Sequence, residues 1–207
     1  YALIRNVTGT GQYKLFSGIC RVASVVGTTV PVTNTARNAA WPTAALTGAD
    51  IVVLKTRLVF TGCDGIQVDG PLGLVSQMAL IGNQTAGTIG LISQRTSSGN
   101  KAKGLVFCST TFGISGFGDG GIYAMYAGTV VAPSVCVANC NVYCVYGQQG
   151  GAALVDNGVL SGCVETGIGS ASSGAVSAQG ALAVGNGLYG VFAFQGGAIL
   201  FQDGFAW

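Results

Sequence analysis

One repeat length runs through most of this chain. Four glycines recur every 23 residues and open the segments GTVVA, GAALV, GAVSA and GAILF. They are Gly128, Gly151, Gly174 and Gly197. The same spacing links two apolar columns and one turn column, which are Ile122, Val145, Ile168 and Val191; Val137, Leu160 and Ala183; and Cys140, Cys163 and Asn186. Internal self-similarity at a fixed period of this size is typical of a repeat architecture.

The content of each repeat selects among the repeat architectures. Each unit holds three apolar segments, for example CVY, AALV and VLSGC, and none is long enough for a helix. Leucine-rich, ankyrin and tetratricopeptide repeats need a helical segment and consensus residues that are missing here. The pattern therefore predicts an all-β parallel β-helix, in which each strand pairs with its equivalent about 4.8 Å away in the next coil. Glycine and asparagine suit the turns, where a positive φ is often needed.

The repeats divide the chain into two parts. Looser copies lie upstream, at residues 56–68, 77–92 and 111–123. We therefore expect coils over about residues 49–204, within a β-helix domain of residues 49–207. Residues 1–48 show no 23-residue register. We interpret them as a β-rich N-terminal cap or connecting segment, because the first coil of a solenoid leaves an open sheet edge that must be covered.

Composition agrees with a β-helix and argues against membrane insertion. The chain is 49% hydrophobic and only 8% charged, with 35 glycines among 207 residues. Glycine and asparagine interrupt its apolar stretches, whereas a membrane helix needs about 20 mainly apolar residues in a row and an outer-membrane strand about 10 alternating ones. No signal peptide is visible and the chain starts at Tyr1, so we expect a piece of a longer protein.

Basic residues are confined to the first half of the chain. All nine lysines and arginines lie at or before Lys103. Nucleic-acid modules and interleaved aromatic residues are missing, so a nucleic-acid partner is not expected. The period breaks at the polar stretch SQRTSSGNKAKG, residues 93–104. We expect a loop that exposes Arg95, Lys101 and Lys103, either as a solvated loop or as a contact with an anionic glycan or a neighbouring subunit.

Seven cysteines raise the possibility of a metal site or a disulfide. The chain has no histidine and no C-x-x-C pair, so we expect neither a metal nor another cofactor. Cys140 and Cys163 share a column and should be stacked neighbours. That separation permits a disulfide, but we prefer buried thiols at these positions.

The lack of histidine also limits catalysis. It removes Ser-His and Cys-His nucleophiles and the commonest general base. A glycosidase could still use two carboxylates about 5 to 9.5 Å apart. The candidates are Asp64, Asp69 and Asp119. Their spacing favours no pair, and aspartates at turns commonly cap their own backbone. The sequence therefore favours a protein that is not an enzyme.

Strand alternation predicts an aromatic stripe. If Ile122 and its column point inward, the next column must point outward, because successive side chains face opposite sides of a strand. The outward column holds Tyr123, Tyr146, Gly169 and Phe192. Aligned exposed rings indicate an interface. We prefer a contact with another subunit, and the alternative is a sugar platform with hydrogen bonds from Gln148, Gln149 and Gln195.

The coil GNGLYGVFAFQGGAILFQDG, with its apolar triplets, Gly-Asn turn and QGGA entry to the next strand, resembles the repeats of bacteriophage tailspikes and tail fibres. The resemblance covers about residues 49–204. It implies a right-handed β-helix in a homotrimeric virion protein that binds other tail proteins and host surface polysaccharide. Such proteins are found in the phage tail or outside the cell.

Three functions are open. The preferred one is a structural or receptor-binding module of a phage tail spike or fibre. The second is a polysaccharide depolymerase, either a hydrolase or a lyase, because some members of this group cleave their ligand. The third is a bacterial surface adhesin.

Overall fold

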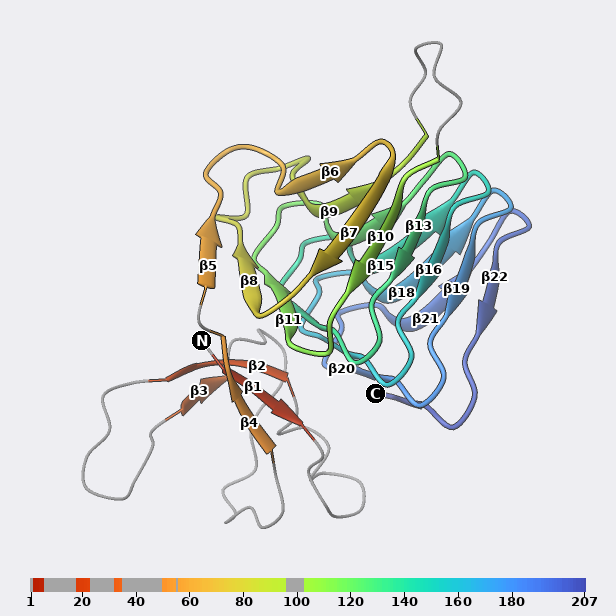
Figure 1. Ribbon diagram of the computed structural model, residues 1–207. Helices are drawn as coiled ribbons and strands as arrows, with labels where there is room; N and C mark the ends of the chain where they lie inside the picture. Colours follow the sequence, from red (N-terminus) through yellow and green to blue (C-terminus); the bar gives the residue numbers. More distant parts are fainter. Residues whose placement is uncertain (1, 6–17, 23–31, 35–49, 55, 96–102) are drawn as a thin grey trace, which may run out of the picture.

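The computed structural model describes residues 2–5, 18–22, 32–34, 50–54, 56–95 and 103–207. Within these ranges every regular element is a β-strand, and the strands form four sheets. Figure 1 shows a stack of coils with a small separate sheet beside it. This part of the chain contains no helix of the length and hydrophobicity needed to span a membrane.

The small sheet is formed by the N-terminal strands and is antiparallel. Its order is β3-β2-β1-β4, with β1 at Ala2–Arg5, β2 at Gly18–Val22, β3 at Val32–Asn34 and β4 at Asp50–Val53. Strand β4 pairs with β1, and the parallel coils start with the following strand, at Thr56. Strand β2 lies against two strands of the stack, β14 and β17. The N-terminal sheet therefore covers part of one face of the coils.

Three parallel sheets form the stack, and each coil contributes one strand to each sheet. Sheet 1 contains β5 (Thr56–Val59), β8 (Met78–Ile81), β11 (Phe112–Ser115), β14 (Cys136–Ala138), β17 (Val159–Ser161), β20 (Leu182–Val184) and β23 (Phe205–Ala206). Sheet 2 contains β6 (Ile66–Val68), β9 (Ile89–Ser93), β12 (Gly120–Ala124), β15 (Tyr143–Gln148), β18 (Thr166–Ala171) and β21 (Tyr189–Ala193). Sheet 3 contains β7 (Pro71–Val75), β10 (Leu105–Cys108), β13 (Thr129–Val131), β16 (Ala152–Leu154), β19 (Ala175–Ser177) and β22 (Ala198–Leu200).

The predicted register is confirmed. Ile122 pairs with Val145, Val145 with Ile168, and Ile168 with Val191. A second column, in sheet 3, holds Val130, Ala153, Val176 and Ile199. Both columns point into the bore of the coils and pack in one hydrophobic core, in which the last members, Val191 and Ile199, are only partly buried. The all-β parallel β-helix with a period of about 23 residues is thus the fold of this chain.

The residues directly before the predicted turn column have a positive φ, as expected for glycine and asparagine at turns. Between sheets 1 and 2, the equivalent positions Gly116, Asn139, Gly162 and Gly185 have φ of +79°, +57°, +65° and +62°. Only glycine adopts this conformation without a steric cost, and asparagine tolerates it better than most residues. Four successive coils therefore share a backbone conformation that glycine or asparagine adopts at this position.

The cysteine prediction was wrong for one residue. Cys163 forms a disulfide, and its partner is Cys144 rather than the stacked neighbour Cys140. Both bonded cysteines belong to the bore cluster, with Cα atoms 6.0 Å apart. Cys144 is the second residue of β15, just after the corner between sheets 1 and 2. Cys163 lies at the same corner of the next coil, so the disulfide joins two successive coils. Asn186 occupies the column position above Cys163 and accepts a hydrogen bond from its backbone N–H at 3.0 Å.

Candidate functional site

Carboxylates lie on alternate coils at the corner between sheets 1 and 2. Asp119 immediately precedes β12, Glu165 immediately precedes β18, and Asp64 lies two residues before β6. Asp119 and Glu165 are two coils apart, which corresponds to about 9.6 Å at 4.8 Å per coil. Asp64 is two coils from Asp119 in the other direction, because it is level with Ile89, whose strand partner is Gly120. The corner thus carries a row of widely spaced acidic groups.

Asp119 differs from the other two carboxylates in its environment. It is half-buried, and the hydroxyl of Tyr123 donates a hydrogen bond to its carboxylate. Burial raises the pKa of Asp119, the hydrogen bond from Tyr123 partly opposes this, and the negative charge of Asp64 raises the pKa further. Burial and the neighbouring Asp119 also raise the pKa of Tyr123, so its hydroxyl stays protonated and keeps donating.

The other two predicted carboxylates make ordinary turn contacts. Asp64 Oδ1 accepts a hydrogen bond from the backbone N–H of Ile89 at 2.7 Å, which ties two coils together. Asp69 accepts hydrogen bonds from the side-chain amide of Gln67 at 3.2 and 3.0 Å. The structure therefore brings Asp64 towards Asp119 and leaves Asp69 at the opposite end of β6, where no second carboxylate is described beside it.

Next to this corner, the outer face of sheet 2 carries stacked rings. The rings of Tyr143 and Tyr146 are 4.2 Å apart and nearly parallel, at 8°. The Tyr123 ring meets Tyr146 edge-on at 5.3 Å. Further along the stack, Phe192 lies 4.6 Å from Tyr189 and 5.2 Å from Phe194. We call the six residues of these stacks the aromatic face: Tyr123, Tyr143, Tyr146, Tyr189, Phe192 and Phe194.

Two glycines make room for the rings. A Cβ atom on Gly120 would lie 2.1 Å from the ring of Tyr123, and one on Gly169 would lie 2.6 Å from the ring of Tyr143. Both distances are too short for any side chain, so the rings lie flat over bare backbone. The gap in the predicted stripe at Gly169 is thus filled by Tyr143 from the preceding coil.

The predicted exposure of the stripe was wrong for two of its three rings. Tyr123 is only 5% exposed and Tyr146 only 8%, because neighbouring side chains on the same face cover them. Phe192 is half-buried. Within the aromatic face, the ring most open to solvent is that of Tyr189, at 48%. The accessible part of the aromatic face is therefore its C-terminal end, over β21.

Sequence reasoning missed Tyr143, Tyr189 and Phe194. The column of Tyr143 holds Gly120, Thr166 and Tyr189, so only every second coil has a ring there. A signal was nevertheless present, because Tyr189 and Phe192 repeat the spacing of Tyr143 and Tyr146 two coils later. A search at twice the period would have found both pairs.

The predicted glutamines surround the edge of this face. The amide of Gln148 lies 2.9 Å from Sδ of Met125, so it is engaged within the protein. Gln149 and Gln195 are exposed, and Gln195 Oε1 accepts a hydrogen bond from the hydroxyl of Ser172 at 3.5 Å. Gln195 directly follows Phe194 and can reach a ligand bound over β21.

The predicted basic loop leaves the coils between sheets 2 and 3. Arg95 and Lys103 are exposed and form an antiparallel bridge at its base, as expected for an inserted loop. Lys101 lies outside the described residues. The backbone N–H of Gly104 then donates to the carbonyl of Gln94 at 2.9 Å, where the chain re-enters the coil.

Metal binding has no support in the described ranges, where no three cysteine or carboxylate side chains come together as ligands. The site therefore offers apolar stacking on rings, hydrogen bonding to amides and carboxylates, and one carboxyl group, that of Asp119, whose pKa is raised. No protein-family model, curated protein or solved structure matches this chain.

Proposed function

We propose that this β-helix is a polysaccharide-binding module of a phage tail spike or tail fibre, and that the aromatic face is where it contacts the host glycan. The observation that carries the proposal is the stacked series Tyr189, Phe192 and Phe194 on β21 and beyond it, with rings 4.6 and 5.2 Å apart. Aromatic rings offer a flat apolar surface. The C–H face of a pyranose can pack on such a surface while its hydroxyl groups reach polar groups at the edge.

Polar groups lie at both edges of these rings. The backbone carbonyl of Glu165 accepts hydrogen bonds from the N–H groups of Leu188 and Tyr189, so the backbone of Glu165 is held next to that of Tyr189, and its side chain is exposed. Gln195 is exposed on the other side, directly after Phe194. A site with a ring platform and a few hydrogen-bonding side chains matches the usual composition of ligand sites.

Two further features support a protein that works outside the cytoplasm. The Cys144–Cys163 disulfide is of a kind that persists in oxidising surroundings. The second feature is the shape of the scaffold, a stack of coils with few charged residues. A glycan chain can bind along several of these coils. A solenoid of this kind offers the long continuous surface that repeat proteins use for binding.

The test is binding to an array of purified bacterial capsular polysaccharides and lipopolysaccharides. We expect the wild-type chain to bind a subset, and the Tyr189→Ala/Phe192→Ala variant to lose at least tenfold in affinity because the platform is removed. Tyr126→Ala is the matched control, since Tyr126 is 49% exposed and Tyr189 48%, but Tyr126 lies outside the aromatic face. Binding to no glycan, or equal loss in the control, would contradict the proposal.

The depolymerase alternative rests on Asp119. Its pKa is raised, which is the direction that a general acid needs, and a second carboxylate, Asp64, lies two coils away, about 9.6 Å along the stack. An inverting glycosidase needs two carboxyl groups about 6.5 to 9.5 Å apart. The same array decides this question. Release of oligosaccharides that Asp119→Asn stops, with binding retained, would favour the enzyme over the binding module.

A further inference from the structure

The outer face of sheet 3 carries a row of apolar side chains that nothing in the described chain covers. Strand pairing aligns the row from one end of the sheet to the other, as Leu74, Phe107, Val131, Leu154, Ser177 and Leu200. We call it the leucine row. Four of its members are 66%, 46%, 38% and 50% exposed, namely Leu74, Phe107, Leu154 and Leu200. Aligned apolar side chains with this exposure mark an interaction surface.

The other two faces of the solenoid are covered from within the chain. On sheet 1, the outward side chains of Ala79, Cys136 and Val159 are buried in a cluster with Leu54, and β2 lies against β14 and β17. On sheet 2, the rings of Tyr123, Tyr143 and Tyr146 cover one another, and only the C-terminal end over β21 is open. Parallel sheets are usually covered on both faces, so the open face of sheet 3 is the exception that needs a partner.

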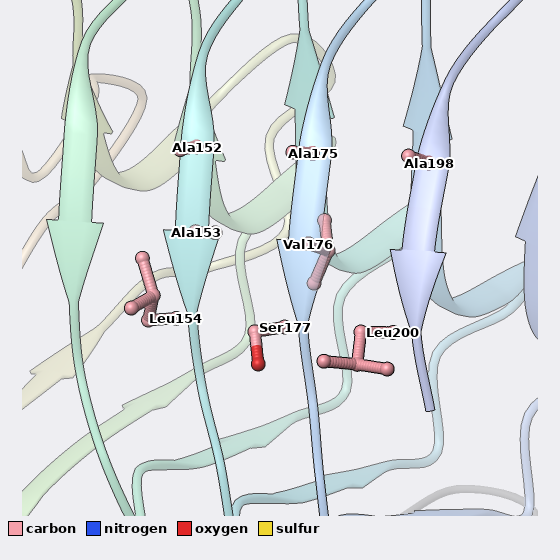
Figure 2. A pocket seen from close by; sticks show the side chains of 8 residues that line it. All are labelled: Ala152, Ala153, Leu154, Ala175, Val176, Ser177, Ala198 and Leu200. Carbon is pink, nitrogen blue, oxygen red and sulfur yellow. The ribbon is translucent and has the colours of Figure 1, made fainter. Parts of the chain in front are cut away.

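The outer face of sheet 3 has large side chains that project on both sides of a shallow hollow. Figure 2 shows Leu154 and Leu200 on either side of the small Ser177, with a parallel row of Ala152, Ala175 and Ala198 beside them. Together they line a shallow apolar hollow of about 200 Å³. Leu154 and Leu200 are two coils apart, about 9.6 Å, which leaves room for one apolar side chain between them.

We propose that this face binds the same face of a second copy of the chain, with a leucine of each copy seated in the hollow over Ser177 of the other. A second copy has the same coil spacing of about 4.8 Å, so a leucine projecting from it fits the gap between Leu154 and Leu200. Neither the leucine row nor the alanine row contains a charged residue, so the two faces meet without like-charge repulsion or an unpaired buried charge. A two-fold axis makes such a contact self-complementary and closed.

The size of the face sets the expected strength. Six strands spaced about 4.8 Å apart, each three residues or more in length at about 3.3 Å per residue, give a face of about 24 by 10 Å. With the relief of the side chains this buries about 500 Å² per copy, or about 1,000 Å² in total, which is the lower limit for a specific interface. We therefore expect concentration-dependent association in the micromolar range rather than a permanent dimer.

Sedimentation velocity of the whole chain between 1 and 100 μM tests the proposal. We expect the weight-average mass to rise with concentration for the wild type and to stay monomeric for Leu154→Lys/Leu200→Lys. Both leucines are on the surface, so folding should survive, which circular dichroism checks. Leu188→Lys is the control, since Leu188 is 67% exposed at the corner between sheets 1 and 2 and should leave association unchanged.

The Ser177→Leu variant distinguishes a shape-complementary interface from nonspecific hydrophobic association. This substitution makes the face more apolar but closes the hollow, so a fitted interface predicts at least tenfold weaker association. Stronger association of Ser177→Leu would overturn the seating of leucine in the hollow. A wild-type chain that is monomeric at 100 μM, or that associates equally well as the Leu154→Lys/Leu200→Lys variant, would overturn the proposal as a whole.

Discussion

Asp119 shows how a single turn residue acquires unusual chemistry in this fold. Its backbone carbonyl accepts hydrogen bonds from the N–H groups of Val142 and Tyr143 at 2.8 and 3.2 Å, and its own N–H donates to Thr88 at 2.8 Å. These bonds fix the residue between two coils. Its half-buried carboxyl accepts a hydrogen bond from the hydroxyl of Tyr123, and burial is the largest cause of its raised pKa.

The raised pKa of Asp119 predicts a pH dependence of stability. Between the unfolded and folded pKa values the folded chain retains a proton that the unfolded chain has lost, so the free energy of unfolding falls as the pH rises through this interval. Asp119→Asn cannot ionise and should lack this fall. Urea unfolding at several pH values from 3 to 7 measures the difference between the two proteins.

Asp203→Asn provides the control, because Asp203 is an exposed turn residue near the C-terminus. It should follow the wild-type profile. A constant difference between wild type and Asp119→Asn across the whole pH range would show that the Asp119 carboxyl does not titrate differently in the folded chain.

At the scale of the strand, the positions of residues that repeat once per coil could be predicted from the sequence. The contacts of residues that lack an equivalent in the next coil could not. The inward columns follow from the sequence because every coil must fill the same bore, as with Ile122 and Val145. Tyr143 and Cys144 lie where β15 turns the corner, and neither has an equivalent residue in the adjacent coils. Their contacts run diagonally between coils, and a column-by-column reading cannot reveal such contacts.

The orientation of β19 can be tested by comparing a substitution at the inward-facing Val176 with one at its neighbour Ala175. Val176 is 2% exposed in the bore, while Ala175 on the same strand faces solvent. Val176→Asp should lower the free energy of unfolding by several kcal/mol, about 3 or more, because it buries an unpaired charge. Ala175→Asp should change it by less than about 0.5 kcal/mol. Urea denaturation of both variants gives the comparison, and equal losses would mean that the strand is not oriented as described.

For the whole molecule, stability depends on contacts between successive coils. In a solenoid each repeat touches only its neighbours, so the stack can open from one end without disturbing the rest. The last coil shows the effect, since Val191 and Ile199 are less buried than their equivalents in earlier coils. The Cys144–Cys163 disulfide joins two successive coils near this end and limits such opening.

The disulfide should therefore make stability depend on reductant. Its two cysteines are 19 residues apart, and closing a loop of this size stabilises the folded chain by about 3 kcal/mol. We expect dithiothreitol to lower the free energy of unfolding of the wild type by about 2 to 4 kcal/mol and to have no effect on Cys144→Ala/Cys163→Ala. Cys140→Ala, which alters the stacked neighbour of Cys163, should keep the response to reductant. Peptide mapping of the unreduced protein would identify the pair directly, and a Cys140–Cys163 peptide would show that the column, rather than the corner, determines which cysteines meet.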